Sequence, residues 1–254
     1  METELPALEV CEDPIGPEVV VTFELAAESR PAAGHLERAV KAFVSAGQRG
    51  GLAGQSADPR KAMVALSAPL SDQNHTVFCS LAAEAITARA FQLLRHMAAA
   101  FRRQGVRVLR RTVANERGEP SLRQVPAVKD ENEDLVYPVA TPNPGFELIH
   151  EEIPASRTRR CLVEPRSSPD QSMDTVTEWI RPWFELLELG AFTPPVAEPD
   201  FGQSIAGSVQ IFDEATVEIV VDRFEASENA WNVLMNMLAA LHRRKVPLHS
   251  VTIA

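Results

Sequence analysis

The chain has 254 residues, of which 45% are hydrophobic and 24% are charged, and its formal net charge is -10 at pH 7. This length suits one large or two ordinary domains, and the composition excludes collagen-like, coiled-coil and largely disordered chains. The negative charge argues against nucleic-acid binding over most of the surface, because such binding depends on neutralising phosphates; a partner with a basic or neutral surface fits better.

The acidic N-terminus, residues 1–17, has neither the basic nor the apolar segment of a secretory signal, so we expect no export. No apolar run approaches the roughly 18 residues that a membrane span needs. Cys11, Cys79 and Cys161 are widely separated and lack C-x-x-C spacing, which is typical of a reducing compartment. We therefore expect a soluble, cytoplasmic protein in which Cys79 and Cys161 are buried thiols.

The first half of the chain predicts a strand, a helix, a pair of strands, a second helix and a last strand. Hydrophobic periodicity places these elements at residues 19–25, 31–47, 61–70, 75–83, 87–103 and 106–113. A turn at Ser71, Asp72, Gln73 and Asn74 joins the two middle strands, and Thr87 caps the second helix.

A segment rich in proline and acidic residues, 115–140, follows and is typical of a linker. The second half repeats the order of elements, with a hairpin turn at Asp213 and Glu214 and a helix cap at Ser227. Pro182 lies inside its first helix and is expected to kink that helix or break it in two. Residues 8–12 and 146–152 could each add an edge strand.

An internal repeat underlies this order. A shift of about 140 positions aligns residues 76–114 with 216–254 without a gap, and it carries the apolar face of the helix at 31–47 onto that of the later helix. Gly50 then meets Gly190, and both are expected to be C-caps. The aligned pairs include Thr76 and Thr216, Leu94 and Leu234, Met97 and Met237, Arg103 and Arg243, and Ala114 and Ala254, with Trp231 taking the place of Phe91.

The predicted fold class is therefore α+β: two tandem ferredoxin-like (βαββαβ) repeats, related by a pseudo-twofold axis, with antiparallel sheets and helices on one face. The predicted boundaries are residues 1–114 for the first repeat, 115–140 for the acidic linker and 141–254 for the second repeat.

Motifs that could carry chemistry are weak. The glycines Gly47, Gly50, Gly51 and Gly54 follow a helix, whereas a phosphate-binding loop follows a strand and opens a helix. His150, Glu151 and Glu152 lack metal-ligand spacing, and neighbouring strand residues point to opposite faces. The other histidines considered, His75, His96, His242 and His249, have no partner fixed by the sequence.

No nucleophile motif is present, and Asn74 in its N-x-T sequon is interpreted as a turn residue. The basic stretch from Arg102 to Arg117 could suggest RNA, but the third strand offers only Phe78 for stacking, and its counterpart has Glu218. The sequence therefore assigns no catalytic, cofactor-binding or metal-ligating residue, predicts no cofactor, and leans against an enzyme.

The face of each predicted sheet away from the helices is mixed in polarity, with Phe78 and Ser80 in the first half and Glu218, Val220 and Asp222 in the second. We expect the two sheets to pack on each other through this face, or on a partner.

The functional hypothesis is a non-catalytic protein-binding module, possibly an acidic immunity or antitoxin-like inhibitor of a basic toxin. The alternative is a small-molecule or haem-type cofactor binder, either an enzyme or a regulator, since tandem ferredoxin-like chains resemble in fold the chlorite dismutase-like haem proteins and the paired regulatory domains that bind amino acids. That alternative would use His249 as the axial ligand. A third possibility is a structural role in a homo-oligomer.

Overall fold

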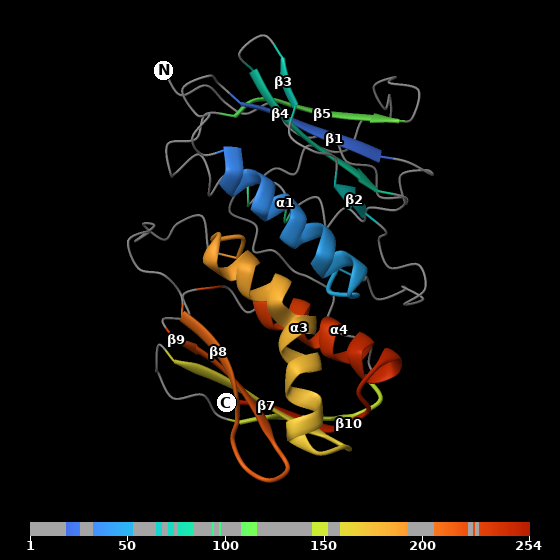
Figure 1. Cartoon of the computed structure of the whole chain (residues 1–254), viewed down its shortest axis with the longest axis vertical. Coiled ribbons are helices and arrows are strands. Elements are labelled where there is room, and N and C mark those ends of the chain that lie inside the picture. The colour runs from blue at the N-terminus through green and yellow to red at the C-terminus, as the bar shows by residue number, and fades with distance from the viewer. Residues whose placement is uncertain are drawn as a thin grey trace.

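The structure is a computed structural model of the whole chain (Figure 1). It describes residues 19–25, 33–52, 65–67, 71–73, 76–83, 93, 97, 108–115, 144–151, 158–192, 206–222, 226 and 229–254. These residues form an α+β protein with two five-stranded sheets, which agrees with the predicted class. The proposed linker lies outside the described residues except for Asn115, which ends a strand.

Sheet A belongs to the first half and contains β1 (Val19–Leu25), β2 (Ala65–Ser67), β3 (Ser71–Gln73), β4 (Thr76–Ala83) and β5 (Val108–Asn115). The strand order is β2-β4-β1-β5, every pairing is antiparallel, and β3 also pairs with β4. The predicted turn at 71–74 is therefore wrong for its first three residues, because Ser71, Asp72 and Gln73 pair with β4 and extend the ladder.

Sheet B belongs to the second half and contains β6 (Glu147–His150), β7 (Arg159–Pro165), β8 (Ala206–Ile211), β9 (Val217–Asp222) and β10 (Leu248–Ile253). Its order is β6-β10-β7-β9-β8. The predicted edge strand near residues 146–152 is confirmed as β6, which runs parallel to β10. The corresponding segment at residues 8–12 lies outside the described residues.

Three helices are described over their length: α1 (Ala33–Gln48), α3 (Pro169–Glu188) and α4 (Asn229–Arg244). Between β4 and β5, Leu93 and Met97 are helical and buried, but the predicted cap at Thr87 and Phe91 lie outside the described residues. The cap predicted at Ser227 also lies outside them.

The predicted glycine caps are confirmed. Gly50 and Gly190 have φ values of +84° and +71°, a left-handed conformation that glycine adopts without a steric penalty. The two helix ends also share one bonding pattern, in which the N–H of the glycine and the next N–H reach back to two carbonyls of the last turn. The acceptors are the carbonyls of Gly47 and Ala46 in α1 and of Leu187 and Leu186 in α3.

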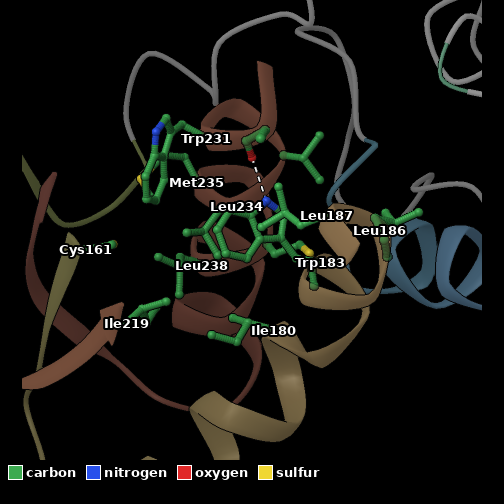
Figure 2. Close-up of a cluster of buried hydrophobic side chains, with 14 of the residues drawn as sticks. Cys161, Ile180, Trp183, Leu186, Leu187, Ile219, Trp231, Leu234, Met235 and Leu238 are labelled. Carbon is green, nitrogen blue, oxygen red and sulfur yellow. Dashed lines mark hydrogen bonds between the residues drawn. The ribbon is translucent and has the colours of Figure 1, made fainter. Parts of the chain in front are cut away.

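The best-described core lies between sheet B and its helices (Figure 2). Trp183 of α3 is fully buried, its indole N–H donates to the Ala230 carbonyl at 2.7 Å, and its ring centroid lies 5.6 Å from that of Trp231. Alternating side chains of sheet B belong to the same core as these rings, because successive strand residues point to opposite faces. The fully buried strand residues are Cys161, Val163, Val217, Ile219 and Val221.

The two halves pack on each other through their helices. Figure 1 shows α1 between sheet A and the pair α3 and α4, with the two sheets at opposite ends of the molecule. Asn236 of α4 donates to the Gly51 carbonyl at 3.3 Å, and Gly50 lies directly against Ala240. The expectation that the sheets pack on each other is therefore wrong.

The reason for this arrangement lies in α4. Its residues from Ala230 to Leu241 are buried except for the partly buried Asn232, so the helix is enclosed on all sides. A helix that is apolar all round belongs in the centre of a molecule. The small residues Gly50 and Ala240 let the turn that follows α1 approach α4 closely.

Pro182 does not break α3, which runs as one helix from Pro169 to Glu188, so of the two expected outcomes, a kink or a division in two, the division is wrong. Proline has no N–H, and the carbonyl four residues earlier, that of Glu178, therefore lacks its helical donor. Arg49 of the first half supplies it: its Nη1 donates to the carbonyls of Glu178 and, at 2.9 Å, of Trp179. A contact between the halves thus satisfies the backbone at the proline.

A double-mutant cycle tests this role of Arg49. Arg49→Met is expected to lower the free energy of unfolding by about 1–2 kcal/mol, because a charged donor to a carbonyl is lost. In a Pro182→Ala background the loss should be clearly smaller, since that variant restores a backbone N–H that can donate to the Glu178 carbonyl from within the helix. Urea denaturation of the four proteins measures the coupling.

The control for this cycle is Arg38→Met. Arg38 lies on α1, which ends just before Arg49, and its exposed side chain contacts Glu188 at 3.5 Å. Such a surface pair contributes about 0–1 kcal/mol, so its loss should matter little in either background. An equal cost of Arg49→Met with and without Pro182 would contradict the proposed role.

Candidate functional site

The hairpin between β8 and β9 presents apolar side chains to solvent. Phe212 is 53% exposed, and Ile211, the last residue of β8, is 41% exposed. The turn is held by two hydrogen bonds, from Phe212 N–H to the Thr216 carbonyl at 3.0 Å and from Ala215 N–H to Asp213 Oδ1 at 2.8 Å. We call residues 211–214 the hairpin tip.

The hairpin tip is also negatively charged, since Asp213 and Glu214 are both exposed. The pKa of the Asp213 carboxyl is lowered, first by the hydrogen bond from the Ala215 backbone and then by the Thr216 hydroxyl. This carboxylate therefore stays ionised well into the acidic range. The predicted turn at Asp213 and Glu214 is confirmed, and it carries an apolar residue beside two acids.

A buried carboxylate lies nearby on the face of sheet B away from the helices. Glu218 is almost fully buried; its Oε2 accepts a hydrogen bond from Gln210 Nε2 at 2.7 Å, and its Oε1 lies 3.6 Å from Arg160 Nη1. Pairing across β7, β9 and β8 sets Leu162 and Gln210 beside Glu218 on this face. The sequence indicated the face correctly, but not that Glu218 is covered and paired.

A pocket lies between the two halves, where their helices meet. It has a volume of about 550 Å³ and is lined by Arg49, Asp174, Thr175, Glu178, Trp179 and Lys245. We call it the seam pocket. The Trp179 ring forms part of its wall, with the Arg49 guanidinium carbon 5.9 Å and the Lys245 ammonium 6.0 Å from the ring centroid. Both distances are within the reach of cation–π attraction.

The Trp179 ring is held in place by its own hydrogen bond, in which the indole N–H donates to the Met237 carbonyl of α4 at 2.8 Å. The pKa of the Arg49 guanidinium is lowered, chiefly by burial, while Glu178 acts in the opposite direction. The wall of the seam pocket is therefore fixed by contacts among α1, α3 and α4.

The described glycines, histidines and acidic residues that the sequence analysis considered as phosphate or metal ligands lie neither at the hairpin tip nor in the seam pocket. Gly50 and Gly51 follow the end of α1 and donate their N–H groups to the carbonyls of Gly47 and Ala46. His150, Glu151 and His249 are exposed, whereas Gly54, His75, His96, Asn74 and Glu152 lie outside the described residues. Among the described residues, no group of three or more His, Cys, Asp or Glu side chains could hold a metal ion.

Cys161 is the buried thiol that the sequence predicted, and burial raises its pKa far above the usual range, so it remains protonated. Cys11 and the side chain of Cys79 lie outside the described residues. No helix in the described part of the chain is long and apolar enough to cross a membrane.

His242 has a structural role that the sequence did not predict. Its Nδ1 accepts a hydrogen bond from the Leu248 N–H at 2.9 Å, and its ring packs edge-on against Phe146 with the centroids 5.7 Å apart. Its pKa is lowered, first by burial and then by the positive charges of Arg166 and Arg243. The neutral ring is therefore the form that holds β10 to the end of α4.

Stability should consequently depend on the protonation of His242. The folded pKa lies below the unfolded value of about 6.5, so the unfolded state binds more protons. The contribution of the neutral ring is full above pH 6.5 and is lost as the pH falls through the lowered folded pKa. Urea denaturation between pH 7.5 and pH 5 should therefore show a loss of stability.

The matched variant is His242→Asn, whose side-chain oxygen can accept the same hydrogen bond but does not titrate. Its stability should fall less than that of the wild type over the same pH range. Parallel pH profiles of the two proteins would contradict the role given to His242.

Comparison with known proteins adds nothing to this geometry. No protein-family model matches the chain, and no curated protein matches it. The two candidate sites are therefore judged on their own chemistry.

The internal repeat separates these sites from the shared scaffold. The same shift of 140 positions aligns Phe212 with Asp72, Trp179 with Ala39, and Lys245 with Gly105. Neither the exposed aromatic residue nor the pocket wall is thus repeated in the first half. These side chains are not part of the pattern that the two halves of the sequence share, which makes both places candidates for function.

Proposed function

We propose that the protein is a non-catalytic, cytoplasmic protein-binding module that recognises a partner with a basic surface through the hairpin tip. The observation that carries the proposal is the exposure of Phe212 beside two carboxylates in an ordered turn. Exposed aromatic residues are frequent anchors of protein interfaces, and charges around them speed association with a partner of opposite sign.

Two further observations support this choice. The chain has a net charge of -10, which favours approach to a basic protein. The halves pack through their helices, so both sheets face outward and β8 lies at one end of sheet B. A basic toxin, such as a nuclease whose active site must bind phosphate, is a partner of the required chemistry, and the module would act as its immunity or antitoxin-like inhibitor.

Affinity capture from an extract of the native host, at low and at high salt, tests the proposal. The bait proteins are the wild type, Phe212→Ser and the double variant Asp213→Asn with Glu214→Gln. The control is Asp72→Ser, at the aligned position of the first half. We expect a basic protein that the wild type and the control capture, and that Phe212→Ser loses.

Titration calorimetry with the purified partner then gives the magnitude. Loss of an aromatic anchor should weaken binding at least about tenfold. Loss of the two charges should mainly slow association and reduce its salt dependence. If no captured protein depends on Phe212, the hairpin tip is not a docking site and the proposal fails.

We also propose that the chain consists of two tandem ferredoxin-like repeats, residues 1–114 and 141–254, joined by residues 115–140. The proposal is supported by the strand orders, since β4-β1-β5 in sheet A has the same order as β9-β7-β10 in sheet B. A shift of 140 residues carries β1 onto β7 end to end, and the helix ends at Gly50 and Gly190 share their bonding pattern.

The haem alternative receives no support from the position of His249, which is exposed on β10 and does not line the seam pocket. A small-molecule ligand of another kind is considered below on the evidence of that pocket. Sedimentation velocity over a range of concentrations tests the homo-oligomer alternative, which requires self-association without any partner.

A further inference from the structure

We propose that the seam pocket binds a short zwitterionic peptide, with Lys245 contacting its carboxylate, Asp174 its ammonium group and Trp179 an apolar side chain. This site is separate from the hairpin tip, and the proposal does not depend on the proposed function. Pockets at the boundary between domains are common ligand sites, and a volume of about 550 Å³ lies within the usual range of roughly 300–1,000 Å³.

The charges of the pocket select the class of ligand. Its lining carries two cations, Arg49 and Lys245, and two carboxylates, Asp174 and Glu178. Glu178 is paired with Arg181, and Arg49 Nη1 is bound to the backbone of α3. Lys245 and Asp174 form no ion pair with any residue in the described part of the chain. One charge of each sign therefore remains for a ligand.

A ligand with only negative charge would be repelled by the carboxylates, and one with only positive charge by Arg49 and Lys245. A zwitterion satisfies both free charges at once, because charge-assisted hydrogen bonds need opposite signs. The pocket exceeds the size of a single amino acid, which favours a peptide of two or three residues. The indole of Trp179, fixed by its bond to Met237, offers a flat apolar surface for one side chain.

The internal repeat adds an independent argument. The five lining residues of the second half, Asp174, Thr175, Glu178, Trp179 and Lys245, align with Gly34, His35, Arg38, Ala39 and Gly105. Not one of them is kept in the first half, although the helices α1 and α3 end at aligned residues. The second-half side chains that line the pocket are therefore not part of the pattern that the two halves share.

Titration calorimetry of the full chain with alanyl-phenylalanine, leucyl-leucine and trialanine tests the inference. We expect saturable binding with a Kd on the order of 1 mM or tighter for at least one of these peptides. Acetylation of its N-terminus or amidation of its C-terminus should each weaken binding about tenfold, because each removes one of the two charges. Lys245→Met and Asp174→Asn should have similar effects.

Three control variants carry the same kinds of change outside the pocket. Asp170→Asn lies one turn earlier on α3, Lys41→Met changes an exposed side chain of α1, and Phe212→Ser alters the hairpin tip. All three should bind the peptide within about twofold of the wild type, because none of these residues lines the pocket. Phe212→Ser also separates this proposal from the one for the hairpin tip.

Two results would overturn the inference. One is the absence of heat or of a change in tryptophan fluorescence for all three peptides at about ten times the expected Kd. The other is binding that survives both Lys245→Met and Asp174→Asn, or that is equally strong for the acetylated and amidated peptides.

Discussion

Gly50→Ala is expected to lower the free energy of unfolding by about 2–5 kcal/mol. The left-handed conformation of Gly50 costs an alanine about 1–2 kcal/mol. The added Cβ would also lie 2.8 Å from the Cβ of Ala240, which cannot rotate away, so the turn after α1 must move away from α4. Overpacking of this kind typically costs about 1–3 kcal/mol. Chemical denaturation measures the total.

Two further variants divide this cost into its parts. Gly34→Ala at the start of α1 adds a Cβ that meets nothing within 4 Å and should be neutral or slightly stabilising. Combining Gly50→Ala with Ala240→Gly removes the clash but keeps the backbone strain, so it should recover part of the loss. An additive double variant would mean that the helices do not meet where the structure puts them.

Trp183→Ala is expected to be the most damaging single change, with a loss of about 3–5 kcal/mol. The side chain is fully buried, contacts Trp231 and Phe184, and its N–H bonds to the Ala230 carbonyl (Figure 2). A cavity of this size between α3 and α4 removes packing on both helices at once. Such a loss is a large fraction of the total stability of a typical domain, about 5–15 kcal/mol.

Trp183→Phe is the matched control, because it keeps an aromatic ring and removes the N–H donor. It should cost less than alanine, with about 0.5–1.5 kcal/mol for the lost hydrogen bond to the Ala230 carbonyl, which keeps its helical donor within α4. Thermal denaturation followed by near-ultraviolet circular dichroism reports both the melting temperature and the packing of the rings. A melting temperature of Trp183→Ala within a few degrees of the wild type would contradict the central position of this residue.

Local pattern sufficed to predict the elements of the second half. Alternation of Val217, Ile219 and Val221 indicated which face of β9 is buried, and the structure has all three fully buried. Gly50 and Gly190 were predicted as caps because each follows the last apolar turn of a helix. Period and capping are properties of a few neighbouring residues, so a sequence records them directly.

The packing of the halves could not be predicted in the same way. Sequence periodicity assigned one apolar side to α4, whereas the structure encloses most of the helix. The small residues Gly50, Gly51 and Ala240 are the signal for close approach of helices, but their meaning depends on which helices meet. The faces of the two sheets away from the helices have mixed polarity. Mixed polarity is compatible both with exposure to solvent and with a packing contact, so the sequence could not show that these faces are not in contact with each other.

Both candidate sites were missed for related reasons. Trp179 lies on the apolar face of α3 and packs against the core, but its ring also forms part of the wall of the seam pocket, which an apolar pattern does not indicate. Phe212 follows a strand and resembles a strand residue, yet it is half exposed in the turn. Comparing the two copies could have found them, since each residue replaces a small or polar one at the aligned position.

Arg49 donates to the Glu178 carbonyl, which Pro182 leaves without a helical donor. This hydrogen bond can form only when the two halves pack together. The packing of the halves and the hydrogen bonding of α3 around residue 182 are therefore thermodynamically linked. Any interaction that stabilises the packing must also stabilise this part of α3. During synthesis the donor leaves the ribosome well before its acceptor, because 129 positions separate them in the chain. Arg49 of the N-terminal half would then be in place to donate to the Glu178 carbonyl when α3 forms.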